Sequence, residues 1–178
     1  MSLIQIEHLY FTYDGGSEPV FEDLDLQLET DWKLGLVGRN GRGKTTLCRL
    51  LAGYQWPTDG QILLDGEPLS RYGRACPVQM IWQHPELVVN PRMPLGRTLA
   101  EGGKLDARIL TGLGIQPSWL SRYPRELSGG ELQRFCIARA LGSQTRFLLA
   151  DEISTMLDLI TQSQIWNFLV REVERRGI

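Results

Sequence analysis

Alternating hydrophobic and polar residues mark the first part of the chain. Residues 3–9 alternate, and residues 23–29 alternate strictly, with leucines on one face. Such alternation is typical of antiparallel strands with one buried and one solvent-facing side. A further edge strand is predicted over residues 61–64, because a short apolar run there ends at an Asp-Gly turn. The pattern therefore predicts an antiparallel β layer near the N-terminus.

Short continuous apolar runs predict a second kind of strand. Residues 33–37 are predicted to form a short buried strand, residues 77–82 another, and residues 147–150 a central parallel strand. Strands covered on both faces have no polar side, so their sequences lack alternation. Together with the first pattern, these runs indicate an α/β fold with a parallel core.

Helical periodicity appears between and after these strands. Helices are expected over residues 45–52, stopped by Gly53, and from Ser128 through Leu141. A last helix ends at Gly177. Its predicted buried face consists of Ile165, Trp166, Leu169, Val170 and Val173.

Within the stretch of about 84–142, prolines and glycines break residues 84–124 into short helical pieces. We interpret this stretch as a small helical subdomain inserted into the core. Residues 1–178 then form a single α/β domain with an antiparallel β subdomain and this inserted helical subdomain.

Composition limits the function classes. A net charge of −2 over 178 residues gives no electrostatic reason to expect nucleic acid. The three cysteines lack C-x-x-C spacing and are expected to be reduced thiols in a cytosolic protein. The N-terminus lacks signal-peptide features, and no apolar run is long enough to span a bilayer. If the protein serves membrane transport, another chain must supply the pore.

The segment GRNGRGKT at 38–45 fits the phosphate-binding pattern G-x-x-x-x-G-K-[ST] between a predicted strand and helix. Glycines let consecutive backbone N–H groups converge on an anion, and the helix N-terminus adds positive potential. Lys44 would reach the β- and γ-phosphates, and Thr45 would hold Mg²⁺. The expected ATP-binding residues here are Gly38, Arg39, Asn40, Gly41, Arg42, Gly43, Lys44, Thr45 and Thr46.

Two acidic residues follow the apolar run at 147–150. In a phosphate-loop enzyme, Asp151 would complete the Mg²⁺ shell. Glu152 beside it could orient and deprotonate the attacking water, so it is the candidate general base.

The segment LSGGE at 127–131 is the next informative motif. Ser128 and Glu131 have the spacing of a capping box, so an ordinary helix cap is one interpretation. The alternative is a second phosphate site, because Gly129 and Gly130 allow close approach to the backbone. One nucleotide cannot occupy both motifs of a small domain. Two chains arranged head to tail could place Leu127–Glu131 of each over the nucleotide of the other.

These motifs, with Gln83 after a strand and residues 155–158 after the Asp-Glu pair, resemble the nucleotide-binding subunit of ATP-binding cassette (ABC) transporters. The resemblance implies a P-loop NTPase core of ABC-ATPase type that binds ATP and Mg²⁺ and hydrolyses ATP. It implies catalytic roles for Lys44, Gln83 and Glu152, and Mg²⁺ contacts from Thr45, Gln83 and Asp151. Tyr13 would stack on adenine, with Tyr10 and Phe11 as alternatives. Asp158 would lie in a turn at the dimer interface.

Residues 83–92, 123–134 and 151–158 are similar to those of dipeptide, oligopeptide and nickel importers. This similarity implies ATP-driven uptake of peptides or nickel. The expected partners are a second ABC ATPase subunit, identical or related, transmembrane permease subunits and an extracytoplasmic substrate-binding protein. The chain would then be cytoplasmic and peripheral on the inner face of the cell membrane.

The chain departs from the family pattern at its end. The family carries one more strand and a histidine that touches the γ-phosphate, and the sequence stops at Ile178 before both. We therefore expect a C-terminally truncated subunit in which ATP binding survives better than hydrolysis. The face left by the missing strand should lower stability or promote association.

Two other functions stay open at this point. A fragment of a soluble ABC-type translation factor is one, because residues 31–44 resemble that class. A catalytically silent binding module is the other, favoured by the missing histidine.

Overall fold

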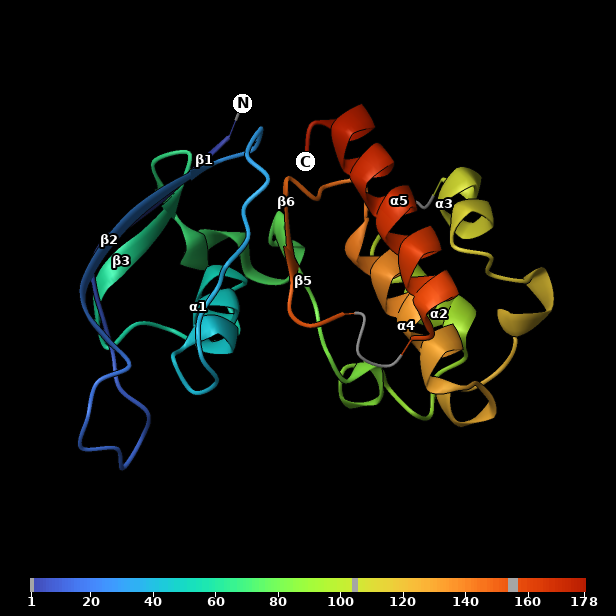
Figure 1. The fold of residues 1–178 in the computed structure, drawn as a ribbon, viewed down its shortest axis with the longest axis horizontal. Coiled ribbons are helices and arrows are strands. Elements are labelled where there is room, and N and C mark those ends of the chain that lie inside the picture. The colour runs from blue at the N-terminus through green and yellow to red at the C-terminus, as the bar shows by residue number, and fades with distance from the viewer. Residues whose placement is uncertain (1, 104–105, 154–156) are drawn as a thin grey trace.

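The computed structural model describes residues 2–103, 106–153 and 157–178. An antiparallel sheet lies at one end, helices lie at the other, and α1 and a short parallel sheet lie between them (Figure 1). The strands are β1 (Leu3–Phe11), β2 (Phe21–Glu29), β3 (Asp59–Leu64), β4 (Glu67–Pro68), β5 (Val78–Ile81) and β6 (Phe147–Ala150). The α-helices are α1 (Lys44–Leu51), α2 (Leu95–Ala100), α3 (Ala107–Gly112), α4 (Gly129–Ala140) and α5 (Leu159–Arg176). Short 3₁₀ helices span Leu69–Ala75, Pro85–Leu87, Pro117–Trp119 and Pro124–Glu126.

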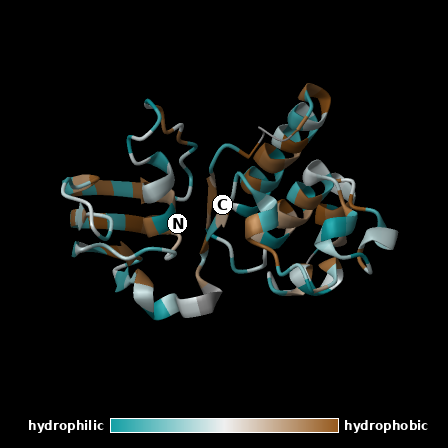
Figure 2. Ribbon diagram, turned by 90° about the horizontal axis from the view of Figure 1, so that it is seen from below, coloured by the Kyte–Doolittle hydropathy of each residue, from teal (hydrophilic) through white to brown (hydrophobic). Residues whose placement is uncertain are grey.

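The predicted antiparallel layer is confirmed. Its strands lie in the order β2-β1-β3-β4, and β1 pairs with both β2 and β3. The prediction that residues 61–64 form an edge strand is wrong, because β3 pairs with β4 as well as with β1. Figure 2 shows hydrophilic and hydrophobic bands alternating along these strands, as the sequence predicts. The inward residues of β1 and β3 pack against Leu47, Leu50 and Leu51 of α1 in one hydrophobic cluster.

A bulge in β1 changes the phase of this alternation. Ile4 and Ile6 are buried before it and Leu9 and Phe11 after it, so the inward positions shift by one residue. His8, at the bulge, has a φ of 48°. A Cβ on Gly60 would lie 2.1 Å from the His8 carbonyl oxygen, so β3 can approach the bulge only through a glycine.

The parallel pair β5–β6 is also as predicted, with Ile81 opposite Ala150 in register. The prediction of a strand over residues 33–37 is wrong. Those residues form no strand, and Leu34, Leu36 and Val37 are 64%, 55% and 95% exposed. A strand needs a hydrogen-bonded neighbour, and no backbone bond joins residues 33–37 to another segment that the structure describes. For the same reason β6, predicted as central, pairs with β5 alone among the strands described.

The helix termini follow the sequence signals. Ser128 and Glu131 form the reciprocal capping box that starts α4. Gly177 ends α5 in the left-handed conformation, with a φ of 67°. The predicted face of α5 is only partly covered, because Ile165 and Leu169 are buried whereas Trp166 and Val170 are more than 40% exposed.

A second hydrophobic cluster joins Ile81 of β5 to residues of α2, α4 and α5. The stretch 84–142 contributes α2, α3 and α4 to it. Across the part of the chain that the structure describes, none of the helices combines the length and hydropathy needed to cross a bilayer.

Beside the bulge, His8 introduces a pH-dependent contribution to stability. A hydrogen bond from its ring to Asp23, 2.8 Å long, and the charge of Asp25 raise the pKa of His8 above its ordinary value. This contribution is therefore complete below the ordinary histidine pKa of about 6.5 and is lost as the pH rises through the raised pKa.

We predict that His8→Asn lowers the melting temperature more at pH 6 than at pH 8.5. Thermal unfolding of the parent chain, His8→Asn, Asp23→Asn and the double variant at both pH values measures this. The melting temperature of the double variant should lose no more of its pH dependence than that of either single variant, because both substitutions remove the same interaction. If His8→Asn lowers the melting temperature equally at the two pH values, His8 makes no pH-dependent contribution to stability.

Candidate functional site

The glycine loop ends where α1 begins, and its last glycine is sterically required. Gly43 precedes Lys44 with a φ of 84°. A Cβ there would lie 2.8 Å from Val20 Cγ1 and 2.9 Å from the Phe21 ring. The start of β2 therefore packs directly against the loop, a contact that the sequence reasoning missed.

A pocket of about 270 Å³ lies at this loop. It is lined by Val20, Asn40, Gly41, Gly43, Lys44, Thr45, Thr46 and Glu152. The Lys44 ammonium donates to the carbonyl oxygens of Gly38 and Arg39, at 2.8 and 3.1 Å. A cation, hydroxyls and a helix N-terminus thus meet in one concave site, which is the arrangement that binds phosphate. The side chains of Arg39 and Arg42 are exposed and do not line it.

Tyr13 lies beside the same loop. Its hydroxyl is 2.8 Å from the Thr46 hydroxyl, and its ring meets Phe11 edge to face with centroids 5.0 Å apart. The Tyr13 side chain is 42% exposed, so an aromatic face is open to a ligand. Phe11 is buried in the sheet cluster, which leaves Tyr13 better placed than Phe11 for stacking.

Glu152 and Gln83 come together at the ends of the parallel strands. The Gln83 amide donates to Glu152 Oε2 over 2.9 Å. Glu152 has a φ of 49°, a conformation that costs free energy in residues other than glycine and is often found at functional sites. The structure therefore brings Glu152, Gln83 and Lys44 to one edge of the domain.

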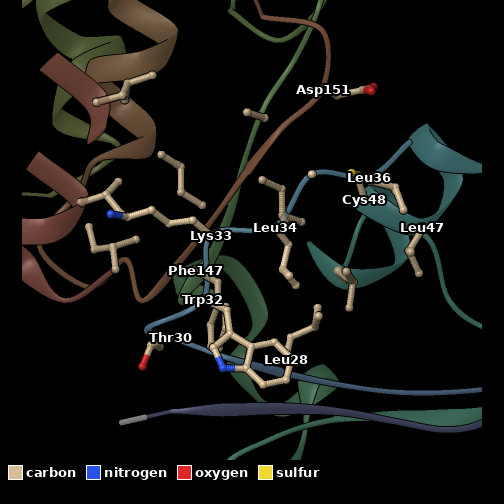
Figure 3. Close-up of a pocket in the computed structure, with 18 of the residues that line it drawn as sticks. Leu28, Thr30, Trp32, Lys33, Leu34, Leu36, Leu47, Cys48, Phe147 and Asp151 are labelled. Atoms are coloured by element: carbon tan, nitrogen blue, oxygen red, sulfur yellow. The ribbon is translucent and has the colours of Figure 1, made fainter. Parts of the chain in front are cut away.

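Asp151 is half-buried, and its charge acts on Cys48 of α1. Burial and the negative charge of Asp151 raise the pKa of the Cys48 thiol to about 11. Asp151 lines a larger groove (Figure 3) rather than the phosphate pocket, and the two depressions share Lys44 and Glu152.

The segment 127–131 is not brought to this pocket. Ser128 caps α4 by accepting from the Glu131 N–H at 3.3 Å, and the Glu131 carboxylate accepts from the Ser128 N–H at 2.7 Å. These hydrogen bonds lower the pKa of Glu131. A Cβ on Gly129 would meet no atom within 4 Å. This helix start is therefore open to the solvent, and none of its residues lines the phosphate pocket.

Asp158 caps α5 by accepting from the N–H groups of Ile160 and Thr161, at 3.1 and 3.0 Å. A hydrogen bond from the Thr161 side chain, together with these backbone hydrogen bonds, lowers the pKa of Asp158. Its neighbours Thr155 and Met156, which the sequence analysis placed in the same turn, lie outside the described residues.

Several curated transport proteins are similar in sequence. The chain is 36% identical over 167 residues to a probable D,D-dipeptide transport ATP-binding protein of Escherichia coli, covering 87% of the chain and 52% of that protein. It is 35% identical over 178 residues to a nickel import ATP-binding protein of Rhodospirillum rubrum, covering 90% of the chain and 64% of that protein. The chain thus spans about half to two thirds of these relatives.

Solved structures share the fold. A dimeric bacterial ABC transporter cassette superposes with a TM-score of 0.82 and 21% identity, covering 98% of this chain and 84% of that one. An ATP-binding protein from Pyrococcus furiosus, assigned to an ABC transporter, superposes with a TM-score of 0.77, covering 99% of this chain and 88% of that one. A sequence model described as "ABC transporter" matches residues 21–155, which is more than half of the chain. The glycine loop and the Asp-Glu pair both lie within that match, and the chain belongs to the ABC transporter family.

Proposed function

We propose that this chain is the ATP-binding and ATP-hydrolysing subunit of an ABC importer. The observation that carries the proposal is that Lys44, Thr45 and Glu152 line one pocket. The relatives named as dipeptide and nickel transport ATP-binding proteins favour uptake of peptides or nickel. They favour this function over a translation factor.

ATP would bind with its phosphates in the loop. Backbone N–H groups of the glycine loop and the ammonium of Lys44 supply positive charge to the phosphate oxygens. Tyr13 would stack on the adenine ring, because its ring is exposed beside Thr46. Base–aromatic stacking contributes about 1–3 kcal/mol per base.

The residues around the loop fit Mg²⁺ chemically. Thr45, Asp151 and Gln83 offer hydroxyl, carboxylate and amide oxygens, which are the ligands that this ion prefers. The Gln83 amide nitrogen donates to Glu152, so the amide oxygen is the atom of Gln83 that would act as a ligand. When bound, the ion neutralises charge on the phosphate oxygens.

Glu152 would act as the general base. A carboxylate at this position can accept a proton from water attacking the γ-phosphate. The hydrogen bond from Gln83 holds Glu152 in place, and it links the site to the stretch that begins at residue 84. That stretch, 84–142, is proposed as the subdomain that contacts the transmembrane permease subunits.

The exposed start of α4 supports a head-to-tail dimer. Leu127–Glu131 lies away from the pocket of its own chain, and Ser128 and Gly129 within it are exposed. A second ABC ATPase subunit, identical or related, would place its own nucleotide against this segment. Asp158 would lie in the turn at the same interface. An extracytoplasmic substrate-binding protein and a peripheral position on the inner membrane face complete the proposed assembly.

We predict that Glu152→Gln leaves ATP affinity within about twofold and lowers hydrolysis by about 10²–10⁴-fold, because only the proton acceptor is removed. A nucleotide-binding titration and single-turnover phosphate release measure the two effects. Glu22→Gln, on the exposed side of β2, is the matched control. Phosphate release that is unchanged in Glu152→Gln refutes the role. If the parent chain binds ATP tightly but releases no phosphate, the catalytically silent binding module is favoured instead.

Ser128→Arg is predicted to abolish ATP-induced pairing while leaving ATP binding to the single chain intact. The added side chain would fill the space that a partner's phosphates need, and residue 128 does not line its own chain's pocket. Sedimentation of the Glu152→Gln background with and without ATP measures the pairing. Ser121→Arg, another exposed serine, serves as control. ATP-dependent pairing that persists in Ser128→Arg would exclude the head-to-tail arrangement.

A further inference from the structure

Gln133 of α4 is completely buried, although its side chain is polar. Its exposed fraction is 0%, and the neighbouring residues Leu132 and Phe135 belong to the helical hydrophobic cluster. A buried amide in such surroundings destabilises a fold unless hydrogen bonds replace those that it made with water. A glutamine at this position consequently depends on the hydrogen bonds of its amide group.

The structure uses only one half of this amide. The Gln133 Nε2 donates to the carbonyl oxygen of Trp82 over 3.0 Å. The Gln133 Oε1 is buried and has no hydrogen-bond partner among the residues that the structure describes. Because a buried acceptor without a partner costs stability, burial alone does not favour a glutamine here. The hydrogen bond to Trp82 is the contribution that an apolar side chain of equal length could not make.

The acceptor, Trp82, lies directly before Gln83 in the chain. The Trp82 carbonyl group and the Gln83 N–H belong to one planar peptide unit, so a hydrogen bond to that carbonyl oxygen restrains the backbone from which the Gln83 side chain extends. Gln83 in turn donates to Glu152 Oε2 over 2.9 Å. Two hydrogen bonds and one peptide unit thus join Gln133 to Glu152.

The Trp82 side chain makes contacts of its own. The guanidinium of Arg49, on α1, lies over the Trp82 ring at 5.1 Å from its centroid, and Tyr54 meets the ring edge to face at 5.0 Å. The ring therefore contacts the helix that follows the phosphate loop, while the carbonyl oxygen of the same residue contacts α4. Trp82 is consequently held from two helices at once.

More side chains of α4 contact the same segment. Cys136 and Arg139 follow Gln133 at intervals of three residues, which places the three side chains next to one another on the helix surface. The Cys136 thiol lies 3.9 Å from the Pro85 carbonyl oxygen, and Arg139 donates to the Val88 carbonyl oxygen over 2.9 Å. α4 therefore holds this segment along its length, and Gln133 is the member of the set whose partner immediately precedes the candidate site.

We propose that Gln133 is a positioning residue, which holds the peptide between Trp82 and Gln83 in the orientation that the hydrogen bond to Glu152 requires. Gln133 does not line the phosphate pocket, so it acts through Gln83. The consequence for hydrolysis rests on the proposed function of Glu152, whereas the orientation of Gln83 is a property of the fold alone.

Gln133→Met tests the proposal, because methionine has nearly the same length and lacks the amide donor. The melting temperature should shift by no more than about 4 °C, since one buried acceptor without a partner, Gln133 Oε1, is exchanged for another, the Trp82 carbonyl oxygen. Gln133→Leu repeats the test with a second apolar side chain. Thr98→Val, on α2, is the matched control, because Thr98 is 1% exposed and its buried Oγ1 likewise has no partner in the described ranges.

The first readout is the side-chain amide signal of Gln83 in a proton–nitrogen correlation spectrum, assigned by its loss in Gln83→Ala. Glu152→Ala gives the position of this signal when the hydrogen bond to Glu152 is absent. The signal should shift toward that position in Gln133→Met and stay in place in Thr98→Val. No nucleotide is needed, so this readout decides the orientation of Gln83 even if the chain releases no phosphate.

The second readout is single-turnover phosphate release. Gln133→Met should lower the rate at least about tenfold while ATP affinity stays within about twofold, because a displaced general base loses much of its contribution. In a Gln83→Ala background, Gln133→Met should lower the rate no further, because both substitutions remove the same restraint on Glu152. Thr98→Val should retain the parent rate.

An unchanged Gln83 signal in Gln133→Met overturns the proposal. Losses of hydrolysis that add in the double variant also overturn it, because Gln133 then acts by a route other than Gln83. If neither apolar variant folds, Gln133 serves stability and the proposal fails. A shifted signal with unchanged phosphate release refutes the link to hydrolysis. If the parent chain releases no phosphate but the signal shifts, the proposed function fails while the positioning of Gln83 stands.

Discussion

The parallel pairing of β5 with β6 is the interaction on which the candidate site depends. Its register places Ile81 opposite Ala150, so the residues that follow each strand emerge at the same edge. Gln83 and Glu152 consequently meet although they are 69 positions apart in sequence. Carboxyl ends of parallel strands are the usual location of ligand sites in α/β sheets, because loops and helix N-termini converge there.

Close packing around the glycine loop provides the second constraint. Gly43 accommodates Val20 and Phe21 only because it lacks a Cβ, so the antiparallel sheet and α1 are locked together at the loop. Tyr13 adds a hydrogen bond to Thr46 from the same side. The β layer thus shapes the phosphate pocket as well as covering α1.

The two hydrophobic clusters meet along β5 and β6, and this is also where the core is open. Val78 and Phe147 belong to the cluster under the antiparallel sheet, whereas Ile81 belongs to the helical cluster. In a two-stranded sheet, each strand has a hydrogen-bonded neighbour on one edge only. An isolated pair of strands is only marginally stable in water. The groove beside β6 therefore lies where the core is open, and it shares Lys44 and Glu152 with the phosphate pocket.

The sequence by itself determined the local elements and the chemical groups. Alternation predicted β1 and β2, and an apolar run before an Asp-Gly turn predicted β3. Capping residues predicted the start of α4 and the end of α5, and the motif at 38–45 predicted a phosphate loop at the start of α1. These features depend on neighbouring residues, and each could be inferred from its own segment. Only the tertiary structure decided that Val20 lines the pocket, that Gln83 bonds to Glu152 and that residues 33–37 form no strand. Such outcomes depend on which distant segment lies alongside, since a strand exists only when its backbone groups find partners, and no local pattern encodes that partner.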